Sequence, residues 1–410
     1  MKIGLITGEF PPMEGGIGDF TANLAQAMAE QGHEVHILTN RKAKLKIKRQ
    51  PSKSVSEAVQ KLGNNWEPQD LEYASLHPRF RRWNWSEMST IADIAIRHEL
   101  DILNVQYQPA AFNMRNPAIN YLPFRVNSIT KTIATFHDLR PPYLFPKAGR
   151  LRKRVVYKLA QRAHGTILTN PANGAELQDH GFGTQHQTMI PIGNNVPTNH
   201  VNHLEIIENR NKLNIPEDAI ILGYFGFLND SKGADDLVSL LEKLGDRYHL
   251  LIMGGGTGDS DSINNQSYTD TIKGDIEMKG LASRVHWTDY LPSNRVSSWL
   301  KTADVMVLPY KDGVSTRRGS LMSALANGVP IVSTQAELIN PLLKDGENML
   351  LAPTGDVEAM ATKVRLIADD QELAERLRKS AKETAAAFTW PEIARETLEF
   401  YRSVLDSKDE

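Results

Sequence analysis

The 410-residue chain contains no cysteine, so it forms neither a disulfide framework nor a thiolate metal site. It also lacks the run of roughly 20 uninterrupted apolar residues that a membrane-spanning helix requires, and its first residues lack the pattern of a cleavable signal peptide. Its hydrophobic content of 40% and charged content of 23% are close to those of ordinary globular proteins. These features predict a folded cytoplasmic protein, and peripheral contact with the inner face of the membrane stays open.

The net charge of −2 hides two oppositely charged halves. Residues 1–200 contain 24 Lys and Arg against 16 Asp and Glu, whereas the remaining residues contain 23 against 33. The basic side chains of the first half gather in residues 41–49, 79–85 and 150–154. Two interpretations stay open: a solvated surface, or attraction to anionic lipid headgroups or a phosphorylated acceptor, because Trp and Phe stand beside the cations. We expect no nucleic acid partner, since the sequence pI is about 6.7 and no groove-reading motif is present.

Apolar runs alternate with amphipathic patterns in two successive rounds. The first round predicts strands at 2–7, 34–38, 102–105, 132–136 and 165–169, with a helix at 19–31, and the second predicts strands at 220–226, 249–254, 285–287 and 305–309. Such alternation is typical of parallel sheets covered by helices on both faces. We therefore predict an α/β protein with two Rossmann-like domains that face each other across a ligand-binding cleft. Residues 41–70 lack this periodicity and are interpreted as an insertion or a long loop.

The most informative stretch lies in the second round. Residues 303–310 are an apolar run, residues 312–320 form a loop with two arginines and several hydroxyls, and residues 321–332 read as a helix, a turn and another apolar run. A loop that opens onto a helix N-terminus in this arrangement offers backbone N–H groups to an anion.

A second glycine-bearing loop, residues 9–18, follows the first strand and opens the first helix. Its glycines allow the backbone to approach a ligand closely. The spacing is not G-x-G-x-x-G, so nicotinamide binding is a poor fit. A tight turn into the helix without any ligand is the alternative interpretation.

Together these stretches resemble glycosyltransferase family 4, the retaining, group 1-like glycosyltransferases with the GT-B fold. The resemblance covers nearly the whole chain. It implies a Rossmann-like acceptor-side domain at 1–197, a Rossmann-like donor domain for a nucleotide sugar at 198–387, and a C-terminal helix at 388–410 that crosses back to the first domain. It also implies hexosyl transfer in polysaccharide or glycolipid synthesis.

The resemblance assigns a set of donor-binding residues. In the family, the N-terminal glycine loop lies near the donor diphosphate, and an Arg with a Lys five residues later grips the pyrophosphate. Lys232 matches that Lys and follows Gly226, but Phe227 stands in the Arg position. We expect Arg317 or Arg318 to replace the missing cation, with surface pairing to carboxylates as the alternative. The expected donor-binding set is Gly15, Gly16, Ile17, Gly226, Lys232, Ser315, Arg317, Arg318, Gly319, Ser320 and Ser323.

The clearest departure from the family concerns its two glutamates, which contact the donor sugar and the ribose. Alignment on Gly328-Val329-Pro330 places Ser315 and Ser323 at those two positions. A serine hydroxyl cannot act as a charged acceptor for a ribose diol. Either the chain belongs to a subgroup with a rebuilt donor site, which we favour because the Arg-Arg-Gly-Ser loop is retained, or it kept the fold and lost transfer.

The strand ends of the first domain supply the remaining candidates. His137 and Asp138 follow one strand, and Gln106 and Tyr107 follow another. By the resemblance, His137 lies near the reacting sugar, so we expect catalytic roles for His137, Lys232 and Arg318 and acceptor contacts from Gln106, Tyr107 and Asp138. A satisfied structural histidine is the alternative for His137.

We expect no cofactor and no metal. The Asp-x-Asp pattern at 259–261 lies in a polar loop, and the glycines at 254–258 lack the lysine of a P-loop. The partners expected are a nucleoside diphosphate sugar and an acceptor hydroxyl on a glycan, a lipid-linked acceptor or a small molecule. A non-catalytic protein of the same fold that binds a nucleotide or a partner enzyme is the first alternative. A sugar-nucleotide epimerase is the second, although no carboxylates suited to deprotonating a sugar carbon are visible.

Overall fold

The structure is a computed structural model that describes residues 1–13, 15–43, 69–145, 147, 149–182, 186–254, 262–288, 291–338 and 340–407. Most of the predicted insertion at 41–70, with its basic run, lies outside these ranges. The glycines at 255–258 and the Asp-x-Asp pattern at 259–261 also lie outside them.

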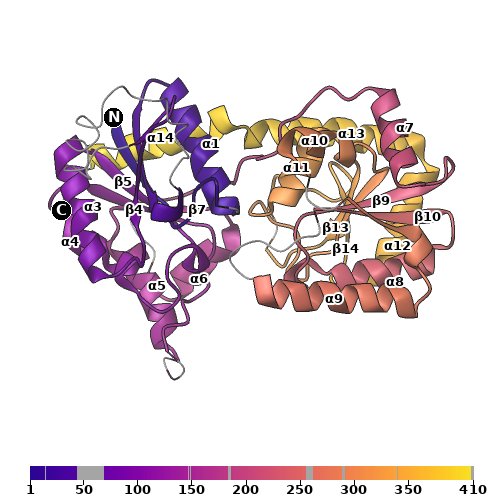
Figure 1. Ribbon diagram of the computed structural model, residues 1–410, viewed down its shortest axis with the longest axis horizontal. Helices are drawn as coiled ribbons and strands as arrows, with labels where there is room; N and C mark the ends of the chain where they lie inside the picture. Colours follow the sequence, from indigo (N-terminus) through magenta and orange to yellow (C-terminus); the bar gives the residue numbers. More distant parts are fainter. Residues whose placement is uncertain are drawn as a thin grey trace, which may run out of the picture. The chain divides into compact units, whose positions relative to one another are not determined.

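The chain divides into two compact units, each built around a parallel sheet. Unit 1 comprises Met1–Ile190 together with Ile393–Glu410, and unit 2 comprises Pro191–Glu392. Each unit carries helices beside its sheet (Figure 1). The α/β fold class with two parallel-sheet domains, predicted from the alternating apolar runs, is confirmed.

Unit 1 contains an eight-stranded sheet in the order β3-β4-β2-β1-β5-β6-β7-β8, in which every pair is parallel except β3 with β4. Its strands are β1 (Lys2–Ile6), β2 (Glu34–Asn40), β3 (Gln69–Asp70), β4 (Ser75–Phe80), β5 (Ile102–Tyr107), β6 (Lys131–Phe136), β7 (Gly165–Leu168) and β8 (Gln187–Met189). The central strands are apolar and buried on both faces, as a parallel sheet covered by helices requires.

Helices cover both faces of this sheet. The helices of unit 1 are α1 (Gly16–Glu30), α3 (Trp85–His98), α4 (Pro123–Val126), α5 (Leu151–Arg162), α6 (Pro171–Asp179) and, from Ile393 onward, α14 (Trp390–Asp406), with short 3-10 turns at Arg41–Ala43, Pro109–Ala111 and Ala118–Tyr121. One hydrophobic cluster joins α3 through α6 to one face. On the other face, Asn104 of β5 meets Tyr401 of α14, so the C-terminal helix belongs to the core of unit 1.

This contact gives a testable prediction for the C-terminal helix. Tyr401 is fully buried, and its hydroxyl accepts a hydrogen bond from the Asn104 amide, whose oxygen accepts one from Thr135. Tyr401→Phe leaves that buried amide donor without its partner, so we expect a loss of about 1–2 kcal/mol of stability. Urea denaturation followed by tryptophan fluorescence measures the loss. The exposed Tyr143→Phe serves as the control, and equal midpoints for the two variants would contradict the prediction.

Unit 2 contains a six-stranded parallel sheet in the order β11-β10-β9-β12-β13-β14. Its strands are β9 (Ile220–Phe225), β10 (Tyr248–Met253), β11 (Val285–Trp287), β12 (Val305–Leu308), β13 (Ile331–Thr334) and β14 (Leu350–Ala352). Its helices are α7 (His203–Lys212), α8 (Ala234–Leu244), α9 (Ser262–Met278), α10 (Ser293–Leu300), α11 (Gly319–Asn327), α12 (Val357–Asp369) and α13 (Gln371–Ala385), with 3-10 turns at Asp230–Lys232, Ala282–Arg284 and Ala386–Phe388. One cluster packs α8, α9 and α12 on one face, and another packs α10 and α11 on the other (Figure 1).

Two element boundaries differ from the prediction in ways that affect function. Helix α1 begins at Gly16, so the second half of the glycine loop forms its first turn. Strand β5 continues to Tyr107, so Gln106 and Tyr107 lie within a buried strand and not after it. The glycines at the start of α1 have a low helix preference, which packing against the rest of unit 1 overrides.

Candidate functional site

The loop after β9 places one predicted cation, Lys232, at the carboxyl end of the sheet of unit 2. The chain leaves β9 at Phe225 and forms a 3-10 turn at Asp230–Lys232 before α8. Gly233 ends this turn with a φ of 67°, and a Cβ there would lie 2.0 Å from the carbonyl oxygen of Pro309. Only glycine fits this position, so the turn that carries Lys232 is held against the segment that follows β12.

Lys232 is a half-buried residue, and its ammonium group lies beside the backbone of Gly226. A Cβ at Gly226 would lie 2.9 Å from Lys232 Nζ, so the glycine leaves room for the ammonium. The ring of Phe227, which stands where the family has Arg, has its centroid 6.0 Å from the same atom. Across the part of the chain that the structure describes, no ion pair or side-chain hydrogen bond involves this ammonium. Burial, and then the positive charge of Arg318, lower the pKa of Lys232 to about 8.

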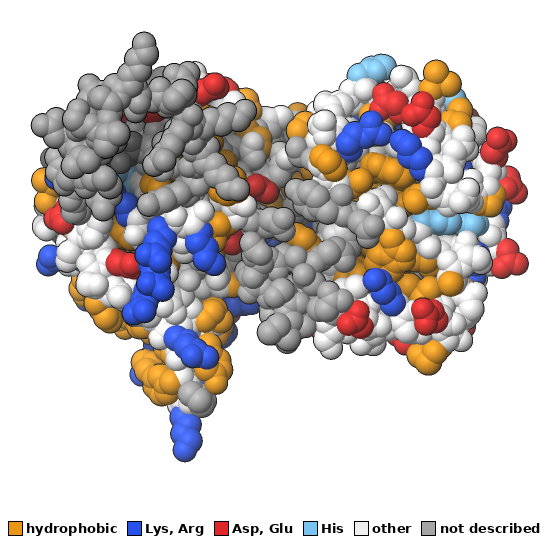
Figure 2. Space-filling model, in the orientation of Figure 1, with side chains coloured by type: hydrophobic (Ala, Val, Ile, Leu, Met, Phe, Trp, Pro, Cys, Tyr) orange, Lys and Arg blue, Asp and Glu red, His pale blue; other side chains and the backbone are white. Residues whose placement is uncertain are grey.

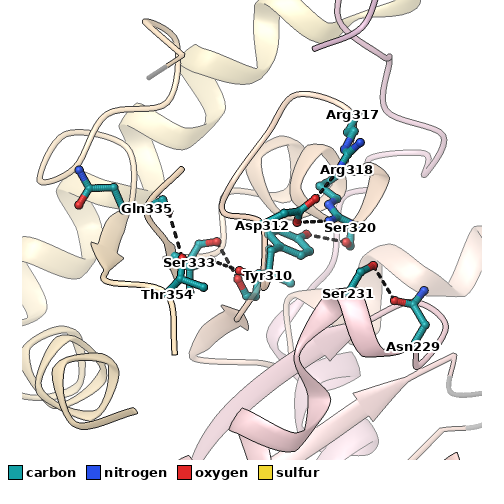
Figure 3. A network of polar contacts seen from close by, with 12 residues as sticks. Asn229, Ser231, Tyr310, Asp312, Arg317, Arg318, Ser320, Ser333, Gln335 and Thr354 are labelled. Atoms are coloured by element: carbon teal, nitrogen blue, oxygen red, sulfur yellow. Dashed lines mark hydrogen bonds and ion pairs between the residues drawn. The ribbon is translucent and has the colours of Figure 1, made fainter. Parts of the chain in front are cut away.

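The loop between β12 and α11 brings both predicted arginines together on one carboxylate. Arg317 and Arg318 each form an ion pair with Asp312 (Figure 3). The guanidinium of Arg318 also lies over the ring of Tyr310, 4.7 Å from its centroid. Arg318 Nε is buried and has no hydrogen-bond partner among the described residues. The pairing with a carboxylate that we weighed as the alternative therefore occurs, but it leaves a donor of Arg318 unused.

Lys232 and Arg318 bring two positive charges close together. Asp312 pairs with Arg318, and no described acid pairs with Lys232. Arg318 lies close enough to Lys232 to lower the pKa of that lysine. Two cations held near each other in a partly buried site are stabilised by an anion that lies between them. The arrangement is therefore suited to a phosphate or diphosphate.

The first turn of α11 lies in the same loop. Gly319 is the first residue of α11, and the hydroxyls of Tyr310 and Ser320 lie 2.7 Å apart at this end of the helix. Burial raises the pKa of Tyr310 to about 12, so its hydroxyl stays protonated. A helix N-terminus carries a partial positive charge that adds to the field of the arginines.

The two serines at the family's glutamate positions lie in different environments. Ser315 is buried, and its hydroxyl has no hydrogen-bond partner among the described residues. The hydroxyl of Ser323 lies 3.0 Å from Asn194 Oδ1 and 2.9 Å from the carbonyl oxygen of Gly319, so it is already used within unit 2. Ser315 remains a candidate for donor binding, whereas the contacts of Ser323 argue for a structural role.

The glycine loop of unit 1 encloses a carboxylate of the chain itself. Glu9 is buried, and its Oε1 accepts a hydrogen bond of 3.1 Å from the backbone N–H of Ile17 in the first turn of α1. A Cβ at Gly15 would lie 2.1 Å from that carboxylate, whereas a Cβ at Gly16 meets nothing within 4 Å. Glu9 therefore occupies part of the helix N-terminus that the sequence suggested for the donor diphosphate. Of the three predicted residues, Gly16 is the most open to a ligand.

His137 and Gln106 lie together at the carboxyl ends of β5 and β6. His137 Nε2 is 3.0 Å from Gln106 Oε1, and the ring of Phe20 packs edge-on against the imidazole at 4.7 Å. Asp138 Oδ1 accepts a hydrogen bond from the backbone N–H of Arg140. These contacts keep His137 and Asp138 at one end of the sheet, where we predicted them.

Tyr107 requires a correction. Its side chain is 1% exposed and packs against Phe112 and Phe136 in the hydrophobic core of unit 1. Strand β5 ends two residues later than the sequence pattern suggested, and Tyr107, its last residue, packs into the core. We withdraw the acceptor contact predicted for Tyr107. Gln106 is also fully buried, and its one described contact is with His137, so it is a positioning residue for the imidazole.

The protonation state of His137 follows from its burial, which lowers its pKa to about 3. We expect the imidazole to stay neutral between pH 5 and pH 8, since both values lie well above that pKa. Its C–H proton resonance, assigned by its absence in His137→Gln, should stay constant over this range while free histidine in the buffer shifts. A shift of the His137 resonance near pH 6.5 would show instead that water reaches the ring.

Three residues at these sites were not among the predicted ones: Tyr310, Asp312 and Glu9. Asp312 precedes Arg317 by five residues in a loop, and this short separation is a usable sequence signal for an ion pair. Tyr310 lies two residues after the end of the apolar strand β12, in the region where ligands of parallel sheets often bind. The burial of Glu9 had no sequence signal.

The architecture defines the class of protein: the chain has the GT-B fold of two parallel-sheet α/β units. Sucrose-phosphate synthase from Thermosynechococcus elongatus matches with a TM-score of 0.74 and 19% identity, covering 100% of both chains. The HepE protein of Anabaena, solved with UDP and glucose, matches with a TM-score of 0.73 and 16% identity, covering 98% of this chain and 100% of HepE.

Family models and curated relatives identify the family. The model described as Glycosyltransferase Family 4 matches residues 14–196, and the model described as Glycosyl transferases group 1 matches residues 205–384. The chain belongs to glycosyltransferase family 4, in the group 1 branch. A D-inositol 3-phosphate glycosyltransferase from a Nocardioides species is 24% identical over 47% of this chain, and the match spans 43% of that relative's length. The phosphatidyl-myo-inositol mannosyltransferase of Mycobacterium leprae is 22% identical over 99% of this chain and 98% of its own.

Proposed function

We propose that the protein transfers a glycosyl unit from a nucleoside diphosphate sugar to an acceptor hydroxyl, with retention of anomeric configuration. The observation that carries the proposal is the surplus of positive charge formed by Lys232 and Arg318 at the carboxyl end of the sheet of unit 2. Family membership and the relatives' names support sugar transfer. The UDP in the HepE structure supports a nucleoside diphosphate as the group bound there.

The proposed mechanism rests on stabilising the leaving diphosphate. When the bond between the anomeric carbon and the diphosphate oxygen breaks, negative charge grows on the diphosphate. Lys232 and Arg318 donate hydrogen bonds to that charge, and the N-terminus of α11 adds its dipole. The acceptor oxygen forms the new bond to the anomeric carbon, and its proton leaves with the departing diphosphate. His137, neutral at pH 7, is assigned to hydrogen-bond the sugar and not to abstract a proton.

We propose a phosphorylated or lipid-linked acceptor. The names of two relatives specify inositol 3-phosphate and phosphatidyl-myo-inositol, both of which combine a phosphate with an inositol ring. The positive charge of the first 200 residues suits such an acceptor electrostatically.

Unit 1 also has a surface patch suited to anionic lipid. Tyr143 and Phe145 are exposed in the segment before α5, and Leu151 is exposed at the start of that helix. Tyr121 packs against Leu144 and Val155 at the base of this region. Tyr121 also contacts the exposed side chains of Trp85 and Phe124. The guanidinium groups of Arg152 and Arg162 lie over the rings of Tyr143 and Phe124, and in Figure 2 orange and blue side chains gather at the segment before α5. We name Trp85, Tyr121, Phe124, Tyr143, Phe145 and Leu151 the aromatic patch. Of the helices in the described ranges, none is long and apolar enough to cross a membrane.

We expect the aromatic patch to hold the protein on vesicles that contain anionic lipid. Apolar side chains that enter the interface and nearby Lys and Arg both favour binding. The double variant Phe124→Ser/Phe145→Ser should bind vesicles of 30% phosphatidylglycerol at least tenfold more weakly in a sedimentation assay, a change of about 1.4 kcal/mol. Leu366→Ser, at an exposed leucine of unit 2, is the matched control and should bind as the wild type does. Equal binding of all three proteins would contradict a role for the patch.

The proposed function is tested first with a panel of nucleotides. UDP, GDP, ADP and dTDP, and then their common sugar forms, are titrated into the protein by calorimetry. The donor that binds is then incubated with phosphorylated inositols and lipid extracts, and mass spectrometry follows the mass of the acceptor. Transfer of one hexose with release of the diphosphate supports the proposal. Absence of binding across the panel contradicts it.

Nucleotide binding without transfer is the second candidate. The observation that favours it is the use of the Ser323 hydroxyl within unit 2, at a position where the family has a glutamate. This function predicts tight binding of one diphosphate and no hexose transfer to any acceptor. The release of an altered sugar nucleotide without an acceptor would indicate an epimerase instead.

A further inference from the structure

Three histidines that are distant in sequence converge at one edge of unit 1. His36 lies on β2, His77 on the neighbouring strand β4, and His98 is the last residue of α3. One ring nitrogen of each lies within 4.8 Å of those of the other two, and this is the one such group of potential metal ligands in the described part of the chain. His36 and His77 are buried and His98 is half-buried. We name these three residues the histidine cluster.

The nitrogen atoms of the histidine cluster are arranged for coordination. His36 Nδ1 and His77 Nε2 lie 3.0 Å apart. Two nitrogens bound to one zinc at about 2.0–2.1 Å in a tetrahedral site are separated by about 3.3 Å. His98 Nε2 is buried without a hydrogen-bond partner among the described residues. Buried polar atoms of this kind are rare in folded proteins unless an ion or a water satisfies them.

Glu34 supplies the outer partner that a metal-bound histidine usually has. Its Oε1 lies 2.9 Å from His36 Nε2, which leaves Nδ1 of the same ring directed at His77. A carboxylate that accepts the second ring N–H orients the imidazole and makes it a better ligand. Arg79 and Arg97 lie near His77 and His98 and oppose a cation, so binding depends on imidazole coordination and not on net charge. That chemistry selects transition metals over Mg²⁺ and Ca²⁺.

We propose that His36, His77 and His98 bind a Zn²⁺ ion, with Glu34 as the outer partner of His36, and that the ion joins β2, β4 and the end of α3. This site is separate from the residues assigned to sugar transfer. A structural zinc adds its binding free energy to the stability of the fold that presents the ligands. In unit 2, His249 Nδ1 lies 2.9 Å from His286 Nε2, but no third potential ligand among the described residues completes a site with this pair. It therefore provides a control.

The experiment uses the full chain without a histidine tag, after chelation and desalting. Addition of ZnCl₂ followed by desalting and elemental analysis should give one zinc per wild-type chain, and CoCl₂ should give the visible absorption of four-coordinate cobalt. Zinc at a hundredfold excess over its Kd should raise the melting midpoint by at least about 3 °C. MgCl₂ should have no effect.

The variants separate the histidine cluster from accidental binding. His98→Ala should lose the zinc and its thermal effect, and Glu34→Gln should weaken zinc binding about 10–100-fold. His249→Ala should bind zinc as the wild type does. Because Glu34 is exposed, its variant folds even if His98→Ala does not, and circular dichroism checks both. Substoichiometric zinc in the wild type, or unchanged zinc affinity in both cluster variants, would overturn the proposal.

Discussion

Replacing Lys232 with methionine is expected to lower the turnover of the donor sugar nucleotide by a factor of about 10²–10³, or about 3–4 kcal/mol. The methionine keeps the length of the side chain and removes its charge. The ammonium of Lys232 has no ion pair in the described part of the chain, so its charge is available to a ligand. A fixed donor directed at charge that grows in the transition state contributes more to turnover than to ground-state binding.

The lowered pKa of Lys232 adds a pH dependence to this prediction. With a pKa of about 8, the side chain is an ammonium at pH 7 and mostly an amine at pH 9. Diphosphate affinity of the wild type should therefore fall as the pH rises through about 8, and that of Lys232→Met should show no such change.

The matched control is Lys311→Ala, which removes a neighbouring cation that already pairs with Asp230 and Asp235. We expect less than a threefold change in turnover for this variant. Steady-state kinetics at pH 7 measures the turnover, and calorimetry from pH 6.5 to pH 9 measures the diphosphate affinity. Equal losses in Lys311→Ala and Lys232→Met would show a general charge effect and not a specific contact.

Replacing Arg318 with alanine should weaken diphosphate binding by about 1.5–3 kcal/mol, the range for a hydrogen bond to a charged group. Arg318 is held between Asp312 and the ring of Tyr310, with its Nε unused, so it is preorganised to donate to a phosphate. Arg318→Lys should restore little, because lysine lacks the planar fork that contacts two oxygens.

Arg317 provides the comparison for Arg318. It shares Asp312 but is more exposed, with 22% of its side chain accessible against 11% for Arg318. We therefore assign the replacement of the family's missing arginine to Arg318, and we expect Arg317→Ala to change binding less than threefold. Calorimetry on both variants decides whether Arg317 or Arg318 contributes more to diphosphate binding.

Introducing Phe227→Arg into Arg318→Ala should recover part of the affinity, because it restores the cation at the family position. No recovery, together with equal losses for both arginines, would contradict this assignment.

The sequence predicted the fold because its signals were local. The apolar runs at 220–226 and 305–309 lie in parallel strands β9 and β12, since continuous apolar stretches with helices between them have few other arrangements. The loops that carry Lys232 and Arg318 follow those strands and so lie at one edge of one sheet. The position of the arginine loop, residues 312–320, at the same end of the sheet as Lys232 could therefore be predicted from the order of the strands.

What the sequence did not reveal depends on contacts between distant residues. Tyr107 was misplaced because β5 continues two residues past its predicted end, and Tyr107 joins Leu103 and Val105 on the core-facing side of the strand. The short separation of Asp312 from the arginines signals an ion pair, but only the folded loop shows that both arginines share this one carboxylate. The histidine cluster joins residues up to 62 positions apart on three elements, and only the register of β2 with β4 and the end of α3 brings them together.

The central claim is that Lys232 and Arg318 bind the diphosphate of the donor. A crystal structure of the protein with the tightest-binding diphosphate of the panel tests it most directly. We expect an oxygen of the terminal phosphate within about 2.7–3.1 Å of Lys232 Nζ and of a guanidinium nitrogen of Arg318, the range of charge-assisted hydrogen bonds. A bound diphosphate that contacts neither side chain would contradict the account.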